Sequence, residues 1–169
     1  MNETTPYHAP FSVETQALFA REVAKFPSAH AQSAVMACLS IIQNERGWVS
    51  RAAEDELAAY LGMAPIAVYE VTTFYNMYNQ QPVGKFKINV CTNLPCQLRD
   101  GQAALAHICR KLGVTVGGTT ADGQFTVQQS ECLGACADSP VMLVNDREMI
   151  SFMSNDRIDD LLATLAQAK

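Results

Sequence analysis

Four of the six cysteines fall into two short pairs, and this grouping constrains the chain more than any other feature. The sequence CTNLPC spaces the first pair as C-x4-C, and CLGAC spaces the second as C-x3-C, with 35 residues between them. In a reducing compartment, clustered cysteines more often bind a metal or carry out redox chemistry than form disulfides. The cysteines concerned are Cys91, Cys96, Cys132 and Cys136.

The first half of the chain has the spacing of amphipathic helices. Ser12, Ser28 and Ser50 are each placed to cap the start of a helix, because a serine side chain can accept a hydrogen bond from the first turn. Gly47 and Gly62 are placed to end two of these helices. The sequence therefore predicts an N-terminal helical bundle.

A polar stretch with proline and glycine, NQQPVG, marks the end of the helical region. The pattern that follows predicts a strand at 86–90, a helix at about 97–112, a strand at 125–128, a hairpin of 141–144 with 148–150, and a closing helix at 155–168. The order β-α-β-β-β-α resembles a thioredoxin-like domain. We predict an α+β protein with a helical region over residues 1–80 and a thioredoxin-like domain over residues 81–169.

Each cysteine pair follows a predicted strand, so both pairs are expected on loops at the same end of the sheet. Four thiolates converging there could hold a [2Fe–2S] cluster, which takes two thiolates per iron. Structural zinc and a pair of disulfides are the alternatives, since zinc sites use similar gaps. The other two cysteines, Cys38 and Cys109, lie on apolar helical faces and are expected to be buried as small hydrophobic residues. Asp138 would make reduction of a cluster harder if its carboxylate pointed inward.

The charge and hydropathy of the chain exclude several classes of partner. A net charge of −5 with no basic run disfavours nucleic acid. No apolar run approaches the roughly 20 residues that a membrane-spanning helix needs. The first twelve residues lack the basic start and apolar stretch of a secretory signal. We expect a cytoplasmic protein without direct membrane insertion.

The aromatic run FYNMY has two interpretations. Phe74, Tyr75, Met77 and Tyr78 are expected to belong mainly to the core. The alternative is that part of the run packs on a partner, because aromatic residues and methionine are enriched at the centres of interfaces.

The motifs VCTNLPCQLRDG and ECLGACADSPVMLVND resemble those of the 24-kDa-type [2Fe–2S] subunit of respiratory complex I, the NADH:quinone oxidoreductase. The upstream stretches GWVSRAAEDELAAYLGM and VYEVTTFYNMY are also similar to that family, so the resemblance covers about residues 11–165. It implies a thioredoxin-like [2Fe–2S] ferredoxin domain and one cluster. The ligands that it implies are Cys91, Cys96, Cys132 and Cys136.

The resemblance also implies a place in a larger enzyme. The family pairs with a flavoprotein subunit that binds FMN, NADH and a [4Fe–4S] cluster, and its own cluster can accept one electron from the flavin. A bacterial-type member would be cytoplasmic and peripheral to the inner membrane through the complex, with no substrate site of its own. The alternatives are a diaphorase subunit of an NAD-linked hydrogenase or NAD-dependent formate dehydrogenase, and a zinc-binding scaffold module without enzymatic activity.

Overall fold

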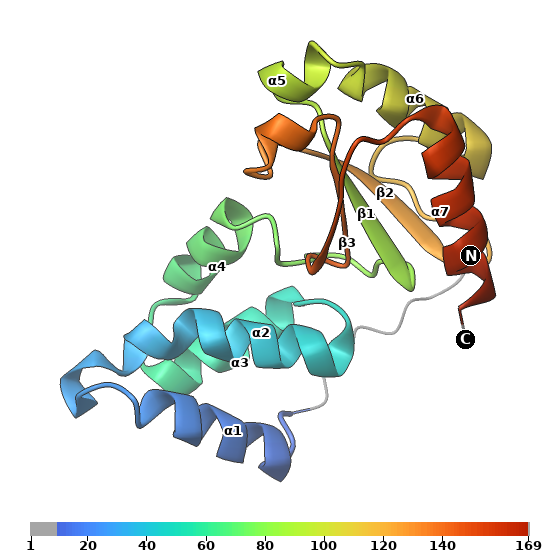
Figure 1. The fold of residues 1–169 in the computed structure, drawn as a ribbon. Coiled ribbons are helices and arrows are strands. Elements are labelled where there is room, and N and C mark those ends of the chain that lie inside the picture. The colour runs from blue at the N-terminus through green and yellow to red at the C-terminus, as the bar shows by residue number, and fades with distance from the viewer. Residues whose placement is uncertain (1–9, 169) are drawn as a thin grey trace. The chain divides into compact units, whose positions relative to one another are not determined.

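The computed structural model describes residues 10–168, which divide into two compact units, one ending at Pro82 and the other beginning at Val83. The described residues of the first unit form helices, and the second unit combines a sheet with helices (Figure 1). Each unit has its own hydrophobic core. Between residues 10 and 168, no helix combines the length and the apolar character needed to cross a bilayer.

Four of the predicted caps, at Ser12, Gly47, Ser50 and Gly62, lie at helix boundaries in the first unit. Ser12 Oγ accepts a hydrogen bond from Thr15 N at 3.1 Å, and Ser50 Oγ accepts one from Ala53 N at 3.2 Å. Gly47 ends a helix in the left-handed conformation, where a residue without Cβ is favoured. The elements are α1 (Val13–Val23), the 3₁₀ helix η1 (Ser28–Ala34), α2 (Val35–Arg46), α3 (Arg51–Leu61) and α4 (Pro65–Phe74).

The helix predicted from Ser28 is wrong in its first turns. The segment η1 begins there as a 3₁₀ helix, and the Ser28 side chain caps nothing. His30 departs from helical geometry, with φ of −124° and ψ of 30°, so the α-helix begins only at Val35. A kink of this kind interrupts the regular ladder of hydrogen bonds, which the spacing of apolar residues does not reveal.

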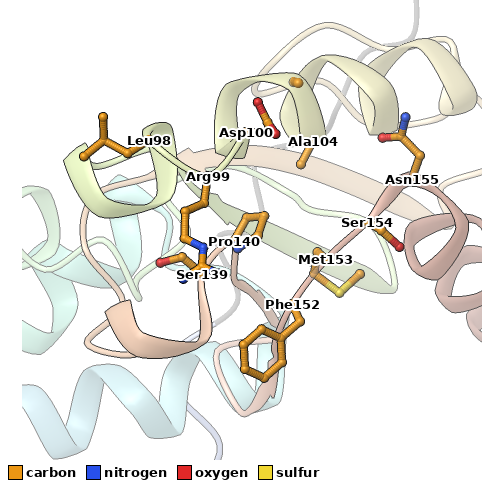
Figure 2. A pocket seen from close by; sticks show the side chains of 11 residues that line it. Leu98, Arg99, Asp100, Ala104, Ser139, Pro140, Phe152, Met153, Ser154 and Asn155 are labelled. Atoms are coloured by element: carbon orange, nitrogen blue, oxygen red, sulfur yellow. The ribbon is translucent and has the colours of Figure 1, made fainter.

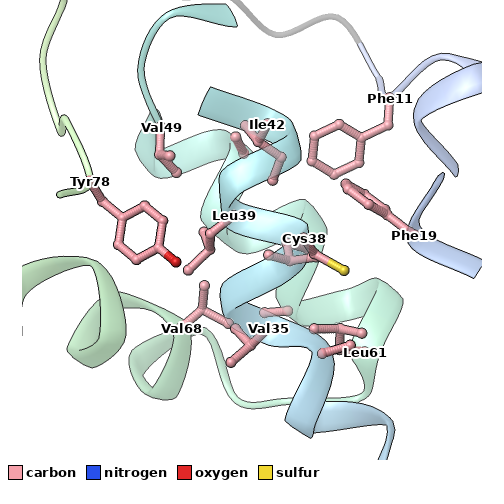
Figure 3. Close-up of a cluster of buried hydrophobic side chains, with 14 residues drawn as sticks. Phe11, Phe19, Val35, Cys38, Leu39, Ile42, Val49, Leu61, Val68 and Tyr78 are labelled. Carbon is pink, nitrogen blue, oxygen red and sulfur yellow. The ribbon is translucent and has the colours of Figure 1, made fainter. Parts of the chain in front are cut away.

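The core of the first unit is built where α1, α2 and α3 turn their apolar faces toward one another (Figure 3). Cys38 lies within it, fully buried, which confirms the expectation for this cysteine. Burial raises the pKa of the Cys38 thiol to about 11, and the negative charge of Glu22 adds to the effect. Other members of this core are Phe11, Phe19, Val35, Leu39, Ile42, Val49, Leu57, Leu61 and Val68.

The aromatic run after α4 is divided between core and surface. Tyr78 is buried, and its hydroxyl donates a hydrogen bond to the carbonyl oxygen of Met36 at 2.9 Å. Phe74 is 80 % exposed, and Tyr75 and Met77 are also exposed. The core interpretation is therefore confirmed for Tyr78 alone.

The second unit is a four-stranded sheet of order β2-β1-β3-β4. Strand β1 pairs in parallel with β2 and antiparallel with β3, and β3 pairs antiparallel with β4. Helices α6 and α7 share one core with the strands, which includes Phe86, Ile88 and Val90 of β1. The elements are β1 (Phe86–Cys91), α5 (Leu94–Gln97), α6 (Gly101–Leu112), β2 (Phe125–Ser130), the 3₁₀ helix η2 (Cys136–Asp138), β3 (Met142–Val144), β4 (Glu148–Ile150) and α7 (Asn155–Gln167).

Central strand β1 also buries polar side chains. Lys87 is 2 % exposed, and its Nζ lies 2.5 Å from Oδ2 of Asp146 in the turn between β3 and β4. Asn89 donates a hydrogen bond to the other oxygen of Asp146 at 2.7 Å. Asn145, the first residue of that turn, accepts a hydrogen bond from Lys87 N and donates its own N–H to Lys87 O. These contacts hold the turn between β3 and β4 against β1, the strand that ends at Cys91.

Candidate metal centre

The two cysteine pairs lie at the same edge of the sheet. Parallel strands β1 and β2 run in register until Cys91 pairs with Ser130, the last residue of each strand. The first pair begins at Cys91 itself, and the second begins two residues beyond Ser130. The alternation of strands and helices therefore correctly predicts that both loops leave one edge.

The first pair is buried. Cys91 is 2 % exposed and Cys96 is 1 % exposed, and both pack with Val141 in a small apolar cluster. Cys96 lies on α5, a single helical turn that follows the strand, with Pro95 in its first turn. Proline fixes its own backbone angle and lowers the entropy lost when the loop becomes ordered.

The second pair is exposed, and its two thiols lie side by side. The Sγ atoms of Cys132 and Cys136 are 3.4 Å apart, and Gly134 N donates a hydrogen bond to Cys132 Sγ at 3.4 Å. Gly134 has φ of 85°, a conformation that glycine adopts without strain. The tight turn between the two cysteines depends on this residue.

Burial and hydrogen bonding shift the pKa values of the thiols. Burial raises the pKa of Cys91, although backbone N–H groups of Asn93 and Leu133 oppose the shift. Burial also acts to raise the pKa of Cys96, but hydrogen bonding with Ser139, Cys91 and the Val141 backbone outweighs it and lowers the pKa.

The pKa of Cys136 is raised, first because it shares a hydrogen bond with Cys132 and then through burial. Charges on Cys132, Cys96 and Cys91 raise it further, so each of the other thiols lies close enough to influence Cys136. Over residues 10–168, no three Cys, His, Asp or Glu side chains are arranged to bind a single metal ion. The four thiols form one buried pair and one exposed pair. Four thiolates are the donor set that a binuclear cluster takes, with two on each iron.

Gly101 is a site residue that the sequence reasoning missed. It opens α6, and a Cβ built on it would lie 2.8 Å from Cys96 O and 2.9 Å from Cys91 O. Both atoms belong to the backbone and cannot rotate away. Helix α6 can therefore approach the first cysteine loop only because this residue has no side chain. The available signal was a glycine five residues after the second cysteine of C-x4-C, at the start of the next helical pattern.

Replacing Gly101 with alanine is expected to displace the first cysteine loop. The overlap should cost about 1–3 kcal/mol of unfolding free energy and reduce the iron retained per chain after gel filtration. Gly113→Ala, at the other end of α6, is the matched control. Gly113 has φ of 66° but open space around its Cβ position, so this change strains the backbone without reaching the cysteines. Equal iron retention in both variants would contradict the role of Gly101.

Asp138 and Cys109 are two further residues that the sequence singled out. The carboxylate of Asp138 accepts a hydrogen bond from Ser151 Oγ at 3.1 Å. Cys109 is partly buried against the core of the second unit, as expected for a small hydrophobic residue, and burial raises its pKa.

A groove of about 660 Å³ opens next to the site (Figure 2). Its walls come from the junction of α5 and α6, from the turn at Ser139 and Pro140, and from the segment leading into α7. Ser139 is 2 % exposed, and its Oγ lies 3.4 Å from Cys96 Sγ. This contact places a hydroxyl directly beside one of the four thiols.

The chain is similar to known proteins along most of its length. The sequence model of the thioredoxin-like [2Fe-2S] ferredoxin family matches residues 19–166. The mitochondrial flavoprotein 2 of NADH dehydrogenase [ubiquinone] from Dictyostelium discoideum is 40 % identical over 147 residues, which are 86 % of this chain and 58 % of that protein. Subunit 2 of the NADH-quinone oxidoreductase of Thermus thermophilus is 36 % identical over 146 residues, covering 86 % of this chain and 81 % of the relative.

A solved structure shares the fold. A chain of an NAD+-reducing [NiFe]-hydrogenase in its H2-reduced state superposes with a TM-score of 0.65 and 23 % identity, over 78 % of this chain and 22 % of that one. At that identity the likeness concerns the fold alone.

Proposed function

The chain belongs to the thioredoxin-like [2Fe-2S] ferredoxin family, and from this premise we propose that Cys91, Cys96, Cys132 and Cys136 hold one [2Fe–2S] cluster in an electron-transfer subunit of an NADH:quinone oxidoreductase. One observation supports the proposal most directly: both thiol pairs lie at the edge of the sheet where β1 and β2 end. A cluster bound there would accept and release one electron at a time.

The protein residues contribute binding, orientation and exclusion of water. The buried pair shields one side of the site from solvent, since Cys91 and Cys96 are almost inaccessible. Backbone N–H groups, including that of Gly134, point at sulfur atoms and stabilise thiolate charge. The exposed pair leaves the other side open toward the surface. Such a site can pass electrons without binding a substrate.

The proposed partner is a flavoprotein subunit that carries FMN, NADH and a [4Fe–4S] cluster, within a larger assembly peripheral to the inner membrane. The names of the two relatives support this setting, because both denote subunits of NADH dehydrogenases. This chain spans 58 % of the Dictyostelium protein. In the proposed assembly it supplies the cluster, while NADH and FMN bind to the partner.

A diaphorase subunit of an NAD-linked hydrogenase or formate dehydrogenase is the second candidate. A chain of an NAD+-reducing hydrogenase shares this fold, but at 23 % identity that likeness does not distinguish the two candidate functions. The relatives at 36–40 % identity favour the quinone-linked enzyme.

Metal and sulfide analysis of the full chain tests the proposed function. The purified protein should contain two irons and two acid-labile sulfides per chain and should be reddish-brown. Reduction should give a rhombic EPR signal from one binuclear cluster. One zinc per chain without sulfide would overturn the proposal in favour of a zinc scaffold.

A further inference from the structure

Ser139 connects the two cysteine loops through one hydroxyl group. It follows the short helix η2 directly and is 2 % exposed. Its Oγ–H donates a hydrogen bond to the carbonyl oxygen of Cys136 at 2.7 Å, and the same Oγ lies 3.4 Å from Cys96 Sγ. A single side chain therefore touches the backbone of the exposed pair and the sulfur of the buried pair.

The direction of the contact with Cys96 depends on whether the sulfur carries a proton. A neutral thiol can donate its S–H to Ser139 Oγ, which is how the two groups are arranged here. A thiolate that ligates iron has no proton and can only accept. The serine hydroxyl rotates about its Cβ–Oγ bond, so it can turn its hydrogen from the Cys136 carbonyl to the sulfur.

We propose that Ser139 donates a hydrogen bond to the ligating sulfur of Cys96 and thereby raises the reduction potential of the site. This inference rests on the proposed function, because it requires the cluster. Reduction by one electron adds one negative charge to the iron and sulfur atoms. A hydrogen bond to a more negative acceptor is stronger, so it stabilises the reduced state more than the oxidised state.

Burial makes this hydrogen bond more effective than one at the exposed pair. Water can replace a hydrogen bond that is lost at an exposed sulfur such as that of Cys132. Cys96 is 1 % exposed and Ser139 is 2 % exposed, so solvent cannot replace the hydroxyl there. The low polarity of the surroundings also strengthens the interaction.

Three variants of the full chain separate this role from a general loss of stability. Ser139→Ala removes the hydroxyl, and Ser139→Thr retains it. Ser154→Ala is the matched control, because Ser154 lines the same groove and caps α7 by accepting a hydrogen bond from Arg157 N (Figure 2). Its loss should destabilise the fold without touching a cysteine sulfur.

The midpoint potential is measured by redox titration monitored by EPR on chains shown to contain two irons. In Ser139→Ala, the ratio of reduced to oxidised cluster at a fixed potential should fall about tenfold, equivalent to a shift of about −59 mV for a one-electron couple. Ser139→Thr and Ser154→Ala should both stay close to the unaltered chain. An unchanged potential in Ser139→Ala, or an equal shift in Ser154→Ala, would overturn the inference.

A second measurement covers the case in which Ser139→Ala fails to hold iron. After exchange into deuterated buffer, pulsed EPR of the reduced unaltered chain should show a strongly coupled exchangeable deuteron, and Ser139→Thr should keep it. Its absence from the unaltered chain would overturn the role of Ser139 while leaving the proposed function intact. If the unaltered chain contains no labile sulfide, the proposed function fails instead.

Discussion

Replacing Cys96 with serine is expected to abolish the visible absorbance of the protein and to lower its unfolding free energy by about 4 kcal/mol. Iron–sulfur clusters select soft thiolate ligands, and a serine oxygen is a harder donor. The position is buried, so water cannot replace the lost ligand. Cluster binding and folding are linked, because the ligands tie together two loops that are separate along the chain. Absorbance spectra and thermal unfolding of the full chain measure both effects.

Cys38→Ser is the control for this experiment. Cys38 is fully buried in the core of the first unit, so a serine there should cost stability by burying a hydroxyl. It should leave the visible spectrum unchanged, because Cys38 belongs to neither pair. A Cys96→Ser protein that keeps its colour would remove Cys96 from the ligand set.

Replacing Asp146 with asparagine is expected to lower the free energy of unfolding by about 3 kcal/mol. The change removes the carboxylate from the Lys87 ammonium group, which is almost fully buried, while the shape of the turn is kept. Removing one partner of a buried ion pair is strongly destabilising, because the remaining charge loses its compensation in a poorly solvated place. Urea unfolding followed by circular dichroism measures the loss.

Asp122→Asn is the matched control for the charge change. The carboxylate of Asp122 lies in an exposed turn and accepts hydrogen bonds from Thr120 Oγ1 and Gln124 N. An asparagine can keep those contacts, so the urea midpoint should stay where it is. If both substitutions lowered the unfolding free energy equally, the effect of Asp146→Asn would come from the loss of one negative charge and not from the ion pair with Lys87.

Local patterns were sufficient to predict most of the longer elements and the edge at which the cysteines meet. Caps such as Ser12 and Ser50 act within one helical turn, so their effect can be inferred from neighbouring residues. The position of the cysteine loops follows from topology, because parallel strands joined by a helix end at the same edge. The family resemblance added the ligand set and the partner, which spacing alone left open.

Contacts between distant segments were not predictable in the same way. Lys87 and Asn89 alternate with apolar residues and suggest a solvated face, yet both are buried because the Asp146 turn covers them. The contact between Ser139 and Cys96 exists only after both loops have folded. The role of Gly101 depends on the carbonyl groups of Cys91 and Cys96, which leave no room for a Cβ atom. The sequence does not show that these carbonyl groups lie beside it.

Strand β1 cannot gain or lose a single residue without moving Cys91, because its register with β2 is fixed. Successive side chains of a strand point to opposite faces, so deleting one residue between Lys87 and Cys91 would turn the cysteine to the other face of the sheet. The Asp146 turn holds Lys87 in place at one end, and the pairing with Ser130 fixes the other. An insertion or deletion of one residue within this strand is therefore expected to prevent binding of the proposed cluster, even where every cysteine is retained.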